Sequence, residues 1–186
     1  MCVMVFSRDG LRCWGEAKAQ ADARWAQGVH VEVEPNMRMI LFGPHGGGLH
    51  DAPDGSPAYQ EFYDSGWPRV VGYYQDSEWC DPADGTPACQ EFYPDGQWKA
   101  IGYYGNGERC VQSFYPDGQL ETIEHYSNGW LHDPADGSPA RQWFYPNGSR
   151  QAVEHYSNGE LFDPADGAPT PRSSSRTWKS RFRKRV

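Results

Sequence analysis

Short strand-like stretches alternate with turn sequences along most of this chain. RQWFY (141–145) and RQAVEHY (150–156) are typical, since each mixes aromatic or β-branched residues with polar ones and is followed by a turn triplet. Such residues favour strands. The triplets PDG, PNG and SNG supply the positive φ angles that tight hairpin turns need. The pattern predicts consecutive antiparallel hairpins, because nothing between them is long enough for the crossover helix of a parallel sheet.

Three phrases recur with a period of 30 residues: FYxxG begins at 62, 92, 114 and 144, a Tyr-containing turn phrase at 73, 103, 125 and 155, and DPADG at 81, 133 and 163. DAPDG at 51 is a variant, and after Gly107 the DPADG phrase is missing, so that unit is shortened. Stacked units would align equal side chains into ladders. Adjacent Phe and Tyr would carry rings to both faces of the sheet. The nearly constant columns are Gln60/Gln90/Gln112/Gln142, Phe62/Phe92/Phe114/Phe144, Tyr63/Tyr93/Tyr115/Tyr145 and Tyr74/Tyr104/Tyr126/Tyr156, with β-branched Val71/Ile101/Ile123/Val153.

Other columns vary while the scaffold repeats, and we expect these to face solvent and to carry partner specificity. They are Tyr59/Cys89/Val111/Arg141, Glu61/Glu91/Ser113/Trp143 and Pro68/Trp98/Leu120/Arg150. The residues predicted to bind a partner are Tyr59, Glu61, Trp98, Trp130, Trp143, Arg141 and Arg150.

The fold class predicted is mainly β: an elongated antiparallel sheet of tandem β-hairpin repeats, with one short N-terminal helix and a basic C-terminal tail. Residues 1–36 are expected to form a capping region, because arrays need an atypical unit at an exposed end. It would contain a hairpin (2–14), an Ala-rich helix (16–27) and a strand that pairs with MRMILFG (37–43). Residues 37–171 would form the array and 172–186 the tail.

Composition indicates what forms the core and in which compartment the chain is expected. Of its 186 residues 38% are hydrophobic and 15% aromatic, so rings, which bury ~150–250 Å² each, would supply much of the core. No run of 18 apolar residues predicts a membrane span, and the start has no signal-peptide pattern. Five cysteines without a CxxC motif favour reduced thiols. We therefore expect a cytoplasmic protein, in a bacterium or in the host cell if phage-encoded.

Charge is divided between an acidic body and a basic tail. All 25 acidic residues precede Arg172, together with 10 of the 17 basic ones, so residues 1–171 have a formal charge of −15. The tail is interpreted as docked on the acidic sheet or an acidic partner, bound to nucleic acid, or idle and solvated. As an anchor it would use Arg172, Arg176, Lys179, Arg181, Arg183, Lys184 and Arg185.

Candidate chemistry is sparse. DPADG places two Asp three residues apart, which suits either Ca²⁺ or, the favoured interpretation, turn chemistry in which Asp caps its own turn. His125 and His155 share a column with Tyr73 and Tyr103, which favours ring packing over a metal or acid–base role. No catalytic motif or phosphate loop occurs. The sequence predicts no enzyme, no metal and no cofactor.

The repeated phrases resemble MORN-like repeats of the divergent bacterial and phage kind, which include antitoxin-like variants. The resemblance covers about residues 37–169, and its marks are FYPDGQWKAIGYYGNGE and HYSNGWLHDPADGSPA. It implies an elongated antiparallel sheet and a non-catalytic binding or scaffolding role. The scattered Trp residues and the DPADG phrase depart from the standard motif.

Two functions follow as hypotheses. The first is a non-enzymatic protein-interaction module that binds and modulates or inhibits a partner protein, as an antitoxin-like or phage counter-defence inhibitor. The alternative is an acidic nucleic-acid mimic, or a nucleic-acid-binding accessory protein that uses the basic tail. Mimicry requires carboxylates along one exposed face, whereas many here fall in DPADG turns, so the first hypothesis is preferred.

Overall fold

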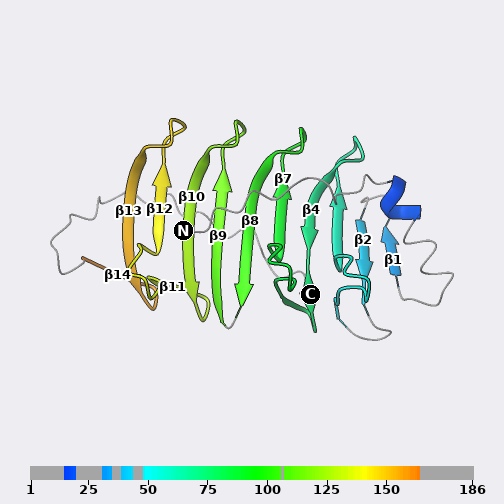
Figure 1. The fold of residues 1–186 in the computed structure, drawn as a ribbon, viewed down its shortest axis with the longest axis horizontal. Helices are drawn as coiled ribbons and strands as arrows, with labels where there is room; N and C mark the ends of the chain where they lie inside the picture. Colours follow the sequence, from blue (N-terminus) through cyan, green and yellow to red (C-terminus); the bar gives the residue numbers. More distant parts are fainter. Residues whose placement is uncertain (1–14, 20–30, 35–38, 44–47, 106, 164–186) are drawn as a thin grey trace.

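A computed structural model describes residues 15–19, 31–34, 39–43, 48–105 and 107–163, which form a long antiparallel sheet with hairpin turns at both ends of its strands (Figure 1). The predicted mainly β fold of tandem hairpins is confirmed. The main sheet has 12 strands: β1 (Val31–Glu34), β2 (Met39–Phe42), β3 (Tyr59–Phe62), β4 (Pro68–Gly72), β7 (Cys89–Phe92), β8 (Trp98–Gly105), β9 (Glu108–Phe114), β10 (Leu120–Ser127), β11 (Trp130–Leu131), β12 (Arg141–Phe144), β13 (Arg150–Ser157) and β14 (Glu160–Phe162). A separate small hairpin joins β5 (Tyr74–Gln75) to β6 (Glu78–Trp79).

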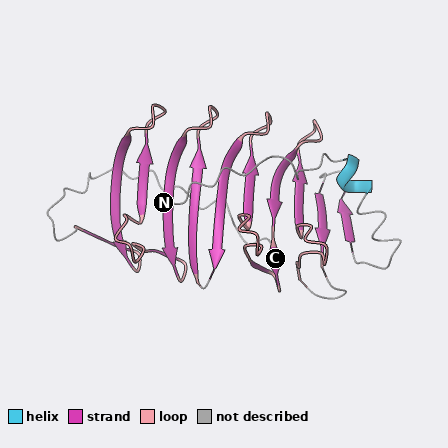
Figure 2. Cartoon of the chain, in the orientation of Figure 1, coloured by secondary structure: helices cyan, strands magenta, loops and turns pink. Residues whose placement is uncertain are grey.

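The N-terminal elements are described only in part. The β1–β2 hairpin forms as predicted, with Val33 opposite Ile40. Residues 15–19 are helical and coincide with the start of the predicted helix, while its remainder and the predicted hairpin at 2–14 lie outside the described residues (Figure 2). The boundaries proposed between cap, array and tail stay predictions.

One row of side chains crosses the sheet from β2 to β13, and it merges two of the predicted columns. Glutamine alternates in it with Ile or Val, because each Gln lies opposite a β-branched residue on both neighbouring strands. Gln90 is buried and donates from Nε2 to the carbonyl of Pro87 at 3.1 Å. The row reads Ile40, Gln60, Val71, Gln90, Ile101, Gln112, Ile123, Gln142, Val153.

The Phe column lies two residues beyond each Gln and therefore shares its face, which we call the ladder face. Phe92 is 2% exposed and Phe62 is also buried. Ala17 of the helical segment and Ala52 of the first loop join Ile40, Phe42 and Phe62 in a buried cluster. The loops and the helix thus help to bury this face.

A tyrosine at the end of each FYxxG strand ties its unit to the next. The hydroxyl groups of Tyr63, Tyr93 and Tyr115 donate to the main-chain carbonyls of Phe92, Phe114 and Phe144, at 2.6, 2.9 and 2.9 Å. The contact recurs because the units are equivalent, so it is a stabilising feature of the array rather than of one site.

Asparagine and glycine form the hairpin turns at the opposite end of the strands. Asn128 and Gly129 have φ angles of 49° and 84°. Two successive positive φ angles are the signature of a type I′ turn, for which Asn-Gly is the preferred pair. The SNG triplets therefore act as predicted.

Candidate interaction surfaces

Each DPADG loop is held by the first of its two aspartates. Oδ1 of Asp81 accepts the backbone N–H groups of Ala88 and Tyr104, both at 2.9 Å. Asp51 and Asp133 make the same pair of bonds to their own units, at 2.7–2.9 Å. One carboxylate oxygen thus joins the end of the loop to a strand 23 residues further along the chain.

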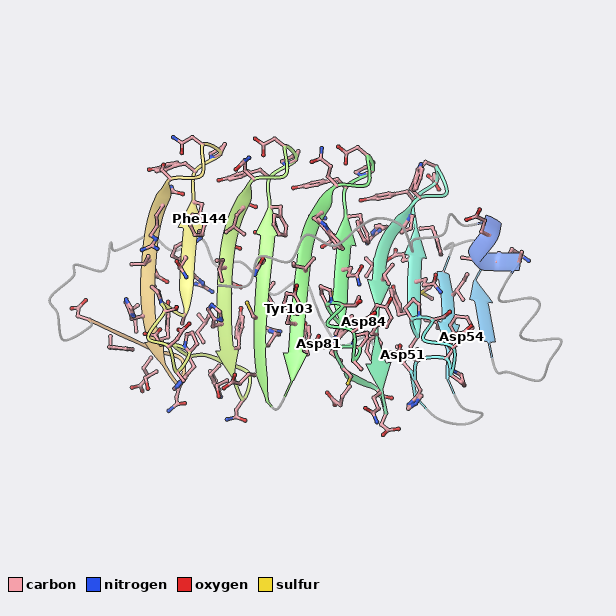
Figure 3. The ribbon with its side chains drawn as sticks, in the orientation of Figure 1. Asp51, Asp54, Asp81, Asp84, Tyr103 and Phe144 are labelled. Atoms are coloured by element: carbon pink, nitrogen blue, oxygen red, sulfur yellow. The ribbon has the colours of Figure 1, made fainter. Side chains whose placement is uncertain are left out.

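The second aspartate caps its own turn. Oδ1 of Asp84 accepts the N–H of Thr86 at 2.9 Å. Hydrogen bonds from the Thr86 side chain and from this N–H hold the pKa of Asp84 below its ordinary value. Asp54 and Asp136 make the equivalent bond. Figure 3 shows two of these loops, with Asp51 and Asp54 in one and Asp81 and Asp84 in the next. The turn interpretation of DPADG is confirmed, and no cluster of three metal-ligating side chains occurs in the part of the chain that the structure describes.

The two histidines of the Tyr/His column have different surroundings. Nδ1 of His155 lies 2.5 Å from Oδ2 of Asp133, and its ring packs at a tilt against Phe162. Burial lowers the pKa of His125 below its ordinary value, although Asp136, Asp133 and Glu108 act in the opposite direction. The predicted ring packing holds for His155, but a loop carboxylate also positions that ring.

A cleft of about 360 Å³ opens at the shortened unit. Its walls come from Asp81 of one DPADG loop and from residues 132–135 of the next. The floor lies between them, where β8 turns directly into β9 and no loop intervenes (Figure 1). The cleft therefore occupies the place where a regular unit would carry its loop.

Tyr103, Cys110 and His125 line this cleft as neighbours on three strands. Cys110 lies opposite Tyr103 on β8 and opposite His125 on β10. Paired residues share a face, and alternation places all three on the ladder face. Glu108 adds an exposed carboxylate to the lining. The cleft combines tyrosine and histidine rings, a thiol, acidic groups and the guanidinium of Arg109.

The opposite face carries a strip of charges and tyrosines, which we call the strip face. Nε of Arg141 donates to Glu124 at 2.7 Å, and its NH1 lies 3.7 Å from Glu154. The hydroxyls of Tyr126 and Tyr156 donate to the same two carboxylates. Most charge in this part of the strip is thus paired within the sheet.

Arg109 lies beside this network on the strip face. Its guanidinium is 3.8 Å from the ring centroid of Tyr126 and 5.9 Å from that of Tyr104, within cation–π range. Its buried Nε has no hydrogen-bond partner among the described residues. Tyrosine rings rather than a carboxylate hold this cation.

The residues predicted to bind a partner do not form one site. Tyr59, Glu61, Arg141 and Trp143 lie on the strip face, and the Tyr59 hydroxyl donates to Glu61 at 3.3 Å. Trp98 stacks on Phe92 at 4.7 Å, and Arg150 lies opposite Phe144, so both belong to the ladder side. Trp130, in the hairpin end, is 64% exposed.

The expectation that variable columns face solvent is wrong at two positions. Cys89, which is 1% exposed, lies between Gly72 and Gly102 of the neighbouring strands. Pro68 is also buried and lies opposite Phe62. Variation there reflects local packing. The sequence analysis also missed Trp67, a turn residue that is 54% exposed. The predicted tail anchor, 172–186, lies outside the described residues.

Comparison with known families agrees with this geometry. Residues 110–128 and 140–158 match the family model described as MORN repeat variant. The chain carries MORN-like repeats. The two matched segments are hairpins of the array, β9–β10 and β12–β13, and the match confirms the resemblance drawn from their sequence phrases. No curated protein and no solved structure matches the chain.

MORN-like repeats make this chain a repeat-based module for interaction with a protein or a membrane. Proteins with such repeats are generally non-enzymatic. Across the described ranges, no helix is both long and apolar enough to cross a bilayer.

Proposed function

We propose that this chain is a non-enzymatic protein-interaction module that binds and inhibits a partner protein, and that the cleft at the shortened unit selects the partner. The observation that carries the proposal is the position of the cleft. It lies where the repeat omits a loop, between Asp81 and Asp133. Concave sites with a few convergent polar groups are the usual places for specific binding.

The repeated polar groups are already engaged within the array. Tyr93 bonds to the next unit, Gln90 to Pro87, and Asp81 to two N–H groups. These groups stabilise the scaffold, and the atoms that form these hydrogen bonds are used within the array. The shortened unit is different, because the omitted loop leaves His125 and Glu108 facing open space.

The lining favours a basic side chain of the partner. Glu108 contributes an exposed carboxylate. Burial lowers the pKa of His125 and so disfavours its charged form. The guanidinium of Arg109, which also lines the cleft, is held over the ring of Tyr126. A Lys or Arg entering the cleft would gain charge-assisted hydrogen bonds and could stack on Tyr103. Nucleic-acid mimicry is supported less, because the aspartates of the loops bond to their own backbone.

The test begins with capture of partners from the native host by the full-length chain. Candidate partners are then titrated against Glu108→Gln and against Glu160→Gln, the exposed residue that follows the SNG turn at 157–159. We expect Glu108→Gln to weaken binding several-fold and Glu160→Gln to leave it unchanged. Co-expression with a captured toxic enzyme should restore growth only for variants that bind.

Equal affinities for wild type, Glu108→Gln and His125→Tyr would contradict a role for the cleft. His125→Tyr is informative because Tyr occupies the same column at Tyr73 and Tyr103, so the scaffold accepts it. Capture of a partner whose activity does not change on binding would contradict inhibition.

A further inference from the structure

The chain of tyrosine contacts ends at Tyr145. The three preceding tyrosines each bond to a Phe carbonyl of the next unit. Tyr145 occupies the same column but is 47% exposed, and its hydroxyl has no hydrogen-bond partner among the described residues. By equivalence with Tyr115, whose hydroxyl reaches the carbonyl of Phe144 on the following FYxxG strand, the acceptor for Tyr145 would belong to the next such strand.

The backbone of β13 also remains available on that side. In β10, the N–H of His125 donates to the carbonyl of Ala140, which begins the strand of the following unit. Alternation gives Ile123 the same direction, and Val153 is its equivalent in β13. The N–H and C=O of Val153 therefore point to the outer edge, where the described residues contain no strand beside 150–154.

Exposed apolar residues continue this edge. Leu161 and Phe162 of β14 are exposed, and Phe162 pairs with His155 just below Val153. Rings and an open row of backbone groups together form the typical template for an added strand.

The chain does not repeat the strand that would fill this edge. In the previous unit DPADG is followed by SPARQWFY, whereas after Asp163 it is followed by APTPRSSS. Pro171 takes the position of Arg141, and serines take those of Trp143 and Phe144. Proline removes a ladder donor and disfavours a paired strand. The sequence after Asp163 therefore lacks the strand pattern of the repeat, and a partner's strand would supply it.

We propose that the β13 edge, defined as residues 150–154 with Tyr145, is a second binding site that takes an extended strand of a partner protein. The guest strand lies antiparallel to β13, exchanges hydrogen bonds with Val153, and offers a main-chain carbonyl to the Tyr145 hydroxyl. An alternating polar–apolar guest would extend the Gln/β-branched row and the Phe ladder. The site is separate from the cleft.

The test uses a labelled synthetic peptide with the sequence of residues 138–146, SPARQWFYP, which is the strand that the repeat itself places against β10. The peptide is titrated into the full chain, and a scrambled peptide serves as the control. Hydrogen exchange of the Val153 amide should slow when the native peptide binds. The Ala152 amide points to β12 and should stay protected with or without the peptide.

Tyr145→Phe removes only the terminal hydroxyl and should weaken the peptide roughly 3- to 10-fold, the effect of one net hydrogen bond. Tyr115→Phe, an internal counterpart, should leave peptide affinity unchanged. Glu108→Gln in the cleft should also leave it unchanged, so failure at this edge is distinguishable from failure of the proposed function. Equal binding of native and scrambled peptides, unchanged Val153 exchange, or self-association of the chain through this edge would overturn the proposal.

Discussion

The hydroxyl of Tyr93 donates a hydrogen bond to the main-chain carbonyl of Phe114, 21 residues away in the next repeat, at 2.9 Å. The bond links neighbouring units without a specific side-chain partner, because its acceptor is backbone. Equivalent bonds at Tyr63 and Tyr115 make it a recurring contact between units.

Removal of one such bond should lower stability measurably. Tyr93→Phe keeps the ring and loses the donor, so we expect a decrease of about 0.5–1.5 kcal/mol in the free energy of unfolding. Tyr145→Phe is the matched control and should have no effect, because this hydroxyl has no partner in the described array. Urea denaturation of both variants measures the difference, and equal midpoints would contradict it.

The Phe column should contribute unequally along the array. Phe92→Ala should cost about 3–5 kcal/mol, a typical value for a buried ring, since Phe92 is 2% exposed. Phe114→Ala should cost less, because Phe114 is only half-buried. Urea midpoints should therefore fall further for Phe92→Ala. A ladder role is wrong if neither midpoint falls.

The carboxylate of Asp81 should matter as an acceptor rather than as a charge. Burial raises its pKa, although the N–H groups of Tyr104 and Ala88 act against this. Asp81→Asn keeps an oxygen for both donors, so it should be neutral or slightly stabilising at pH 7. Asp81→Ala leaves two donors without their acceptor and should destabilise by about 1–3 kcal/mol.

The pH dependence follows from the raised pKa of Asp81. A group with a raised folded-state pKa contributes its stability at pH values below its unfolded pKa and loses it as the pH rises through the folded pKa. The advantage of Asp81→Asn over wild type should therefore be present at pH 7 and vanish near pH 3. Thermal melts at both pH values measure it, and an advantage that grows on acidification would contradict the assigned cause.

The loops should be independent of calcium. Their carboxylates are occupied by backbone N–H groups at Asp51, Asp81 and Asp133, whereas Ca²⁺ requires six to eight oxygen ligands. Melting midpoints in calcium and in EDTA should be equal. A higher midpoint in calcium would restore the metal interpretation of DPADG.

Much of this fold could be predicted from its period. Repetition of Gln and Phe at fixed offsets is enough to place them in ladders, because equivalent units must stack in equivalent ways. The bond from Asp81 to Tyr104 was not predictable, since it joins positions 23 residues apart through loop geometry. Burial within one column also escaped prediction, because Cys89 and Arg141 have different neighbours across the sheet.

The cleft could likewise not be predicted from the sequence pattern alone. The omission after Gly107 is visible in the sequence, but its consequence depends on how far the neighbouring loops rise beside β9. Trp98 and Arg150 occupy a variable column and were therefore predicted to bind a partner. In the structure Trp98 lies opposite Phe92, and Arg150 lies opposite Phe144. Variability identified differences between units, whereas the cleft results from a missing loop.

The most direct measurement restores that loop. In the full chain, residues 105–110 are replaced by a copy of residues 75–88, which carry the turn and DPADG loop of the preceding unit. The filled variant should melt at or above the wild-type midpoint, because it completes a regular repeat. Its affinity for the purified partner should fall at least about tenfold, equivalent to 1.4 kcal/mol. A folded variant that binds the partner as tightly as wild type would contradict the claim that the cleft selects the partner.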